Sequence, residues 1–180
     1  IRTPTPPASR PHASRLAGAF TLLLATGAAH AAAPPPEAER DPGLTVRIHE
    51  VAEPLERLRA VAEGQTPNID RLVPRLDLDR AAFDPATAPF VTEVLGWLVV
   101  DEPGAYRFEL TSDDGARLTI GGEVIVDHDG RHGPTPRTSE PVTLEVGLHR
   151  LRIDHFDAGG NRVLRLAWRR PGAADFAVVP

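Results

Sequence analysis

The feature that most constrains the fold is an alternation of apolar and polar residues in the second half of the chain. In the segment AYRFEL, the apolar residues Tyr106, Phe108 and Leu110 alternate with the charged residues Arg107 and Glu109. Because successive side chains of a β-strand point to opposite faces of a sheet, this period of two predicts a strand with one buried face. The pattern therefore favours a fold built from sheets.

Similar short segments follow at regular intervals, separated by glycine-rich and proline-rich stretches. The pair Gly121 and Gly122 predicts a two-residue hairpin, because glycine adopts the positive φ angles that such turns require. Residues 128–141, rich in Gly, Pro and Thr, are predicted to form a loop. Many short strands joined in this way indicate an all-β, antiparallel sandwich or barrel. The predicted strands are 91–100, 105–110, 117–120, 123–127, 142–146, 148–156, 162–168 and 176–180.

One face of these strands is expected to form the core, since a shift of register by one residue would expose the whole apolar set. The side chains predicted to be buried are Tyr106, Phe108, Leu118, Ile120, Leu151, Ile153, Leu166 and Trp168. The preceding region gives a weaker signal. There, Leu55, Leu58 and Ala62 have near-helical spacing, which predicts a helix within residues 50–63.

Residues 1–31 differ in composition from the rest of the chain. Arginines precede the apolar run LAGAFTLLLATGAA, which is short for a membrane span, and the sequence AHAAA follows. This order is typical of a secretory signal peptide, with cleavage expected after Ala31 or Ala33; a membrane anchor or a buried helix is the alternative. Residues 32–43 are then a proline-rich linker. The mature chain is expected to be secreted, periplasmic or part of the cell envelope, with no membrane contact after cleavage.

Composition excludes some classes of function. The chain has no cysteine, so it can form neither a disulfide framework nor a cysteine-ligated metal site. Its formal net charge is −5, and it becomes more negative once residues 1–31 are removed, because that segment contains arginines and no acidic residue. A negatively charged protein is poorly suited to nucleic acid as a main partner.

Several motifs occur in an order that resembles a known family. They are GWLVV, PGAYRFEL, SDDGARLTIGG, GLHRLRI and LRLAWRRPG. Together they resemble the PA14 domain, the β-sandwich module named after the protective antigen of anthrax toxin. The resemblance covers residues 44–180 and is strongest over 91–180. It implies a jelly-roll-like β-sandwich and a non-catalytic module of secreted adhesins, glycosidases and toxins, often linked to carbohydrate binding.

The resemblance also gives a meaning to the adjacent carboxylates Asp113 and Asp114. In the calcium-dependent lectins of the family, two consecutive aspartates joined by a cis peptide bond bind Ca²⁺, and the metal binds sugar hydroxyls. A hard cation requires six to eight oxygen ligands, so neighbouring carboxylates suit it. The resemblance implies further ligands from a second loop, and Asp157 and Asn161 are the candidates. We expect this site at an exposed end of the sandwich. The alternative is a tight turn, in which an Asp side chain binds its own backbone and Gly115 is left-handed.

Other groups of polar residues give weaker signals. The segment DHDGRHG contains His128 and His132, but its glycines exclude a helical metal site, and a solvated loop is the favoured interpretation. No G-x-S-x-G nucleophile motif supports catalysis. The sequence thus predicts a non-enzymatic glycan-binding module, one domain of a longer exported protein. The alternatives are a spacer domain attached to an exported enzyme, with no ligand of its own, or a hydrolase.

Overall fold

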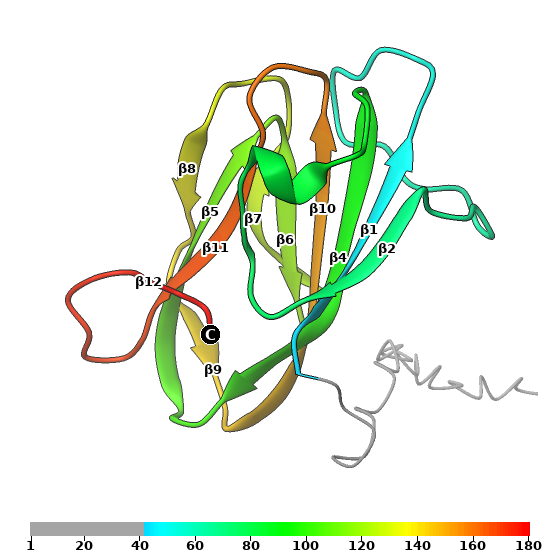
Figure 1. Cartoon of the computed structure of the whole chain (residues 1–180). Helices are drawn as coiled ribbons and strands as arrows, with labels where there is room; N and C mark the ends of the chain where they lie inside the picture. Colours follow the sequence, from blue (N-terminus) through cyan, green and yellow to red (C-terminus); the bar gives the residue numbers. More distant parts are fainter. Residues whose placement is uncertain (1–41) are drawn as a thin grey trace, which may run out of the picture. The chain divides into compact units, whose positions relative to one another are not determined.

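The computed structural model of the protein describes residues 42–180. The predicted signal peptide, residues 1–31, and residues 32–41 of the predicted linker lie outside the described residues. Within 42–180, two antiparallel β-sheets face each other as a sandwich (Figure 1), which confirms the predicted all-β fold class. No helix in this part of the chain is long and apolar enough to cross a membrane.

The larger sheet has six strands in the order β2-β1-β4-β10-β6-β7. Their bounds are β1 (Leu44–Glu50), β2 (Ile69–Val73), β4 (Phe90–Val100), β6 (Ala116–Ile120), β7 (Glu123–His128) and β10 (Gly147–Asp157). The second sheet has the order β12-β11-β5-β8, with β3 paired to β11 and β9 paired to β5. Their bounds are β3 (Asp77–Leu78), β5 (Gly104–Asp113), β8 (Thr135–Thr138), β9 (Val142–Leu144), β11 (Val163–Arg169) and β12 (Ala177–Val178), and a short 3₁₀ helix covers Arg80–Phe83.

The core between the sheets contains the residues that alternation predicts. All eight side chains expected to be buried are at most 6% exposed, which confirms the predicted strand faces. Aromatic rings fill much of the volume on the side of the second sheet, where Tyr106 lies between Phe108 and Trp168 at centroid distances of 6.4 and 5.4 Å. Burial of large aromatic side chains is a major source of stability in a sandwich of this size.

One connection between strands is a simple hairpin, and several others pass from one sheet to the other. Gly121 and Gly122 have φ angles of 61° and 94° and join β6 to β7 within one sheet, so the predicted hairpin is confirmed. By contrast, the SDDG segment joins β5 of the second sheet to β6 of the larger sheet. The connections from β4 to β5, from β9 to β10 and from β10 to β11 also pass between the sheets. Crossing connections of this kind gather loops at the ends of the sandwich.

The predicted helix within residues 50–63 is wrong. β1 continues to Glu50, and residues 51–62 then follow an irregular path without a helical turn. The apolar residues responsible for the helical spacing have a different role. Leu55 is buried against Val91 and Phe156 on the outer side of the larger sheet, and Leu58 packs against the same cluster. Tertiary packing therefore outweighs local helix propensity in this proline-containing segment.

The predicted loop 128–141 contains an additional strand, β8. All four of its residues are exposed, so no apolar alternation marks it in the sequence. It forms because its backbone pairs with Glu109–Ser112 of β5 at the edge of the second sheet. Pro136 is tolerated there, since an edge strand can lack one backbone donor. Strands β1, β2 and β3 are likewise additional to the predicted set.

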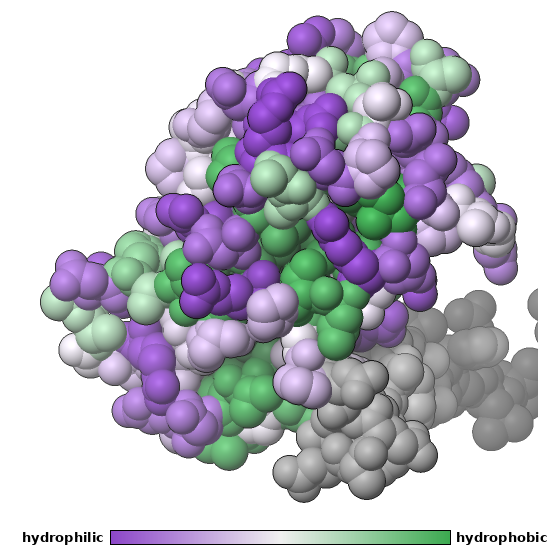
Figure 2. Space-filling model, viewed as in Figure 1, coloured by the Kyte–Doolittle hydropathy of each residue, from purple (hydrophilic) through white to green (hydrophobic). Residues whose placement is uncertain are grey.

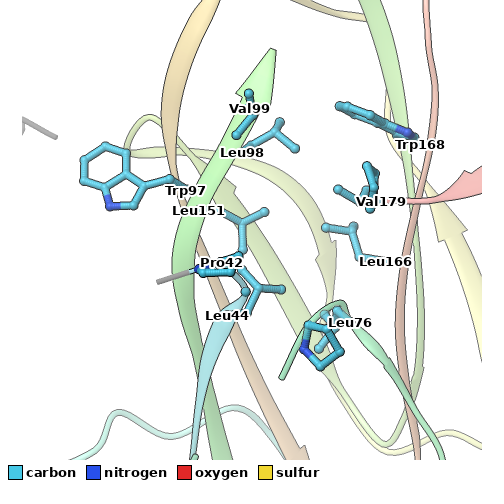
Figure 3. Close-up of a pocket in the computed structure, with 13 residues that line it drawn as sticks. Pro42, Leu44, Leu76, Trp97, Leu98, Val99, Leu151, Leu166, Trp168 and Val179 are labelled. Atoms are coloured by element: carbon cyan, nitrogen blue, oxygen red, sulfur yellow. The ribbon is translucent and has the colours of Figure 1, made fainter. Parts of the chain in front are cut away.

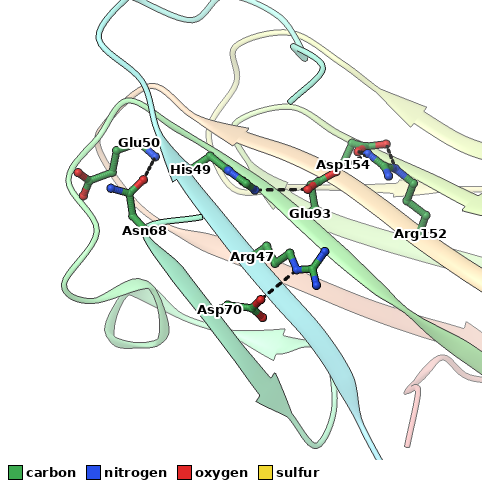
Figure 4. A network of polar contacts seen from close by, with 8 residues as sticks. All are labelled: Arg47, His49, Glu50, Asn68, Asp70, Glu93, Arg152 and Asp154. Atoms are coloured by element: carbon green, nitrogen blue, oxygen red, sulfur yellow. Dashed lines mark hydrogen bonds and ion pairs between the residues drawn. The ribbon is translucent and has the colours of Figure 1, made fainter. Parts of the chain in front are cut away.

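The outer face of the larger sheet carries a polar network (Figure 4). Arg152 Nη2 lies 2.7 Å from Glu93 Oε1, and the same guanidinium binds Asp154. The buried His49 places Nε2 3.3 Å from the other Glu93 oxygen. The carboxylates of Glu93 and Asp154 are both paired with Arg152. This network therefore accommodates charged residues on adjacent strands and leaves neither carboxylate unpaired for a ligand.

Candidate functional site

Three connections meet at the upper end of the sandwich in Figure 1. They are the β5–β6 junction, which carries Asp113 and Asp114, the β7–β8 loop, and the β10–β11 loop. The structure therefore brings Asp157, the last residue of β10, to the same end as the aspartate pair. Asn161 lies in the same β10–β11 loop and is exposed.

Asp114 joins the three connections. Its Oδ1 accepts a hydrogen bond of 3.2 Å from the backbone N–H of His132, and its Oδ2 accepts one of 2.8 Å from Ala158. Its own N–H donates to the carbonyl of Phe156. The tight-turn interpretation is wrong in this respect, because the carboxylate binds the backbone of two distant loops. The predicted exposure is also wrong, since Asp113 and Asp114 are 4% and 5% exposed.

Asp113 differs sharply from its neighbour. The peptide bond between the two aspartates is cis, the geometry that the family resemblance implies. The Asp113 backbone carbonyl accepts a hydrogen bond of 3.0 Å from His155 Nε2, which identifies the ring nitrogen that carries the proton. No described residue donates a hydrogen bond to the Asp113 carboxylate. Burial, and then the charge of Asp114, raise the pKa of Asp113.

Asp157 is the third carboxylate of this end. Its Oδ1 accepts a hydrogen bond of 2.8 Å from the N–H of Gly159, whereas Oδ2 is buried without a donor among the described residues. Arg162 Nε lies 3.5 Å from Oδ2, and its guanidinium stacks over Phe90. Burial raises the pKa of Asp157 to about 6, against the lowering effects of the Gly159 bond and the Arg162 charge.

These groups partly fit a calcium ion. Within residues 42–180, no three His, Cys, Asp or Glu side chains are grouped so that they could hold a metal ion. A cation at this end would therefore take Asp113 and Asp114 together with backbone carbonyls, water or the Asn161 side chain. What favours a cation is the lack of donors. The Asp113 carboxylate has no donor among the described residues and lies beside the charge of Asp114, and a bound cation would supply the missing partner and reduce the repulsion.

The β7–β8 loop is structural rather than a metal site. The rings of His128 and His132 stack at a centroid distance of 3.8 Å. Both ring nitrogens of His132 lie within 3.1 Å of backbone carbonyls, which occupies the atoms that a transition metal would need. Asp129 accepts a hydrogen bond of 2.7 Å from the N–H of Leu58, which attaches the 51–62 segment to this loop. No sequence pattern marks these contacts, because backbone groups are present in every residue type.

Gly115 is required by close packing. Its φ angle is not positive, so the left-handed conformation of the turn interpretation is wrong. A β-carbon at this position would lie 2.7 and 2.8 Å from the backbone N and O of Gly130, and 2.6 Å from the ring of Phe156. The β5–β6 junction thus packs directly on the β7–β8 loop, and only glycine leaves room for it.

Gly115→Ala is expected to lower the free energy of unfolding by about 1–3 kcal/mol, the cost of forcing atoms into a packed site. Gly133→Ala is the matched control, because a β-carbon there meets no atom within 4 Å and its φ is not positive. Chemical denaturation of both variants measures the difference. Equal stability of the two would contradict the close packing at Gly115.

His155 is fully buried beside Phe83 and Phe90, and burial lowers its pKa to about 4. The unfolded chain binds a proton near pH 6.5, so this contribution to stability is complete above pH 6.5 and is lost as the pH falls toward 4. We expect the His155 ring to remain neutral at pH 5. An NMR titration of the metal-free protein, with the resonance assigned through His155→Asn, measures this. Titration near pH 6.5 would mean that the ring reaches solvent.

A separate apolar cavity of about 290 Å³ opens between the sheets, away from the aspartates. Figure 3 shows Leu98 and Leu151 of the larger sheet facing Leu166 and Trp168 of the second. In the space-filling view, hydrophobic residues reach the surface in the middle of this face of the molecule (Figure 2). Among residues 42–180, those that line the cavity include no charged side chain, so they supply no groups for acid–base chemistry or for binding a metal.

The fold and the loops at its end define a β-sandwich module with a candidate ligand site formed by crossing connections. The family model described as the PA14 domain matches residues 40–180. The chain therefore belongs to the PA14 domain family, as the sequence motifs predict.

Solved structures with this fold share little sequence with the chain. The PA14 domain of the MpAFP antifreeze protein has a TM-score of 0.67 at 18% identity, over 76% of this chain and 86% of that one. The PA14 sugar-binding domain from an RTX adhesin has a TM-score of 0.65 at 20% identity, over 77% and 95%. The epithelial adhesin 9 A domain from Candida glabrata, in complex with Galb1-3GlcNAc, has a TM-score of 0.59 at 12% identity, over 80% and 88%. A search of curated proteins by sequence gives no match.

Proposed function

We propose that this chain is an exported, non-catalytic module that binds carbohydrate with the help of Ca²⁺ at the Asp113–Asp114 end of the sandwich. The observation that carries the proposal is the Asp113 carboxylate, which lies beside a second carboxylate in a residue that is only 4% exposed and receives no hydrogen bond from the described residues. Membership of the PA14 family supports it, as do two similar structures whose descriptions name a sugar-binding domain and a bound disaccharide.

The residues have distinct roles in this proposal. Asp113 and Asp114 hold the cation, and the Asn161 side chain is a further candidate ligand. Asp157, which the sequence also suggested as a ligand, is not grouped with the aspartate pair and lies beside Arg162 instead. The ion supplies a positive charge with free coordination positions, to which sugar hydroxyls bind. Asp114 also fixes the site, because its bonds to His132 and Ala158 hold the two neighbouring loops in place. Arg162 offsets part of the negative charge through Asp157.

Catalysis has no comparable support. The Asp114 carboxylate is occupied by two backbone donors, and His155 is buried with both ring nitrogens engaged by Thr92 and the Asp113 carbonyl. Neither group is placed to exchange protons with a substrate. The alternative function is a spacer domain of an exported enzyme without a ligand of its own.

A glycan array tests the proposal against this alternative. The chain is applied once with millimolar calcium and once with a chelator. The proposal predicts binding to a subset of glycans that disappears with the chelator. A spacer domain would bind none under either condition, and binding that the chelator does not affect would remove the role of Ca²⁺.

Export is tested separately. Cleavage after Ala31 or Ala33 predicts that the mature protein begins at residue 32 or 34. N-terminal sequencing of material recovered outside the cytoplasm measures this directly. A mature chain that still contains the apolar run before residue 30 would contradict the signal peptide.

A further inference from the structure

A second pocket lies directly beside the aspartate site. It has a volume of about 190 Å³ and is lined by Ala52, Pro54, Leu55, Pro89, Arg131 and Ala158. Two of these residues connect it to Asp114. The N–H of Ala158 donates to Asp114 Oδ2, and Arg131 directly precedes His132, whose N–H donates to Asp114 Oδ1. A ligand held at the aspartates would therefore have this pocket within reach.

The floor of the pocket is apolar and fixed. Leu55 is buried and packs against Val91 and Phe156 of the larger sheet, and Ala158 packs against the same cluster. The other lining residues, apart from Arg131, are alanine and prolines. Such a surface gains free energy when it covers a methyl group and loses it when it covers a charge that finds no partner.

The walls of the pocket are tied together. One wall is the 51–62 segment, and the other is the β7–β8 loop. The N–H of Leu58 donates to Asp129 Oδ1 at 2.7 Å, and Arg131 Nη1 lies 3.3 Å from Glu56 Oε1. These two contacts cross from one wall to the other, so the pocket is preformed rather than assembled by a ligand.

Arg131 is the one charged residue among the described residues that line the pocket. Its charge is already balanced by Glu56, so the pocket has little net attraction for an anionic sugar. A guanidinium has five N–H donors, and those that do not face Glu56 remain free for a neutral acceptor. The best match is therefore a group that combines a carbonyl oxygen with a methyl group.

We propose that this pocket binds the acetamido group of an N-acetylated hexosamine whose hydroxyls are held at Asp113 and Asp114. The methyl group packs on Leu55 and the flanking alanines and prolines, and Arg131 donates to the carbonyl oxygen. The volume equals the space that roughly six water molecules take up in the liquid, which is more than an acetamido group needs. This inference rests on the proposed carbohydrate function and assigns its substrate class.

The test compares each N-acetylated sugar with its parent, N-acetylglucosamine with glucose and N-acetylgalactosamine with galactose, by calorimetric titration in millimolar calcium. In at least one pair, the acetylated sugar is expected to bind about tenfold more tightly, which corresponds to about 1.4 kcal/mol. Arg131→Ala and Ala52→Leu should each reduce this ratio to about two or less. Ala52 is exposed, so the larger side chain fills the pocket without entering the core.

Arg59→Ala is the matched control. Arg59 is as exposed as Arg131, 53% against 52%, and is likewise paired with a glutamate of the same segment, but it does not line the pocket. It should keep the full ratio. Equal affinity for acetylated and parent sugars, or a ratio that Arg131→Ala leaves intact, overturns the pocket assignment while the carbohydrate function stands. Binding of none of the four sugars overturns the pocket assignment, and the glycan array alone then decides the carbohydrate function.

Discussion

Phe108→Ala is expected to lower the free energy of unfolding by about 3–5 kcal/mol, the usual cost of removing a large aromatic side chain from a core. Phe108 is fully buried in the middle of β5, next to Tyr106 and opposite Trp168 in the strand pairing. The strand pairs on either side hold the backbone in place, so the cavity cannot collapse easily. Urea denaturation followed by tryptophan fluorescence measures the change.

Phe176→Ala is the control for this prediction. Phe176 is only partly buried near the end of the chain, where Arg169 stacks over its ring. The same chemical change there should cost much less, because little surface returns to water and no cavity forms. If the two variants lost similar stability, the assignment of Phe108 to the centre of the core would be wrong.

Asp113→Asn is expected to remove most of the calcium response of the protein without weakening the metal-free fold. At a hundred times its dissociation constant, a ligand that binds only the folded state stabilises it by about 2.7 kcal/mol. A hundredfold loss of affinity would reduce this gain to about 0.4 kcal/mol. In chelator, Asp113→Asn should melt at or above the wild-type temperature, because it removes a buried charge whose pKa is raised by desolvation and by Asp114.

Asp114→Asn gives the contrasting result. Both carboxylate oxygens of Asp114 accept backbone hydrogen bonds, and an amide would turn one of them into a donor that faces a donor. This variant should therefore lose stability in chelator as well as in calcium. Thermal melts of both variants, with calcium and with chelator, separate the two roles. A lower metal-free melting temperature for Asp113→Asn would show that its carboxylate has a structural partner.

The sequence predicts the faces of the strands better than their pairing. The alternation around Phe108, Leu118, Ile153 and Leu166 is enough to place these residues in the core, because a period of two has only one buried register. Which strands lie side by side depends on contacts far apart in the chain. β10, for example, lies between β4 and β6, and no local pattern encodes those neighbours.

Local sequence patterns also fail to predict secondary structure where backbone pairing or tertiary contacts determine it. β8 is fully exposed and is held by backbone pairing alone, so its side chains give no sign of a strand. In the 51–62 segment, the spacing of Leu55 and Leu58 suggests a helix. The segment is instead irregular, and both side chains pack in the cluster that contains Phe156. In each case, an interaction with another part of the fold outweighs the local propensity.

The same limit applies to the candidate site. Asp113 and Asp114 stand out in the sequence because two adjacent carboxylates need an explanation. The donors to Asp114 come from positions 18 and 44 residues away and are backbone N–H groups, which any residue type carries. The reason for Gly115 is equally hidden, since it depends on the approach of Gly130 from another loop.

The most direct test of the account is a calorimetric titration of calcium into the metal-free wild-type chain and into Asp113→Asn, followed by titration of a glycan identified on the array. We expect the wild-type chain to bind calcium, Asp113→Asn to lose this binding, and the glycan to bind only after calcium has been added. If the wild-type chain bound no calcium at millimolar concentration, or bound the glycan equally well in chelator, Asp113 and Asp114 would not form a cation site for carbohydrate recognition.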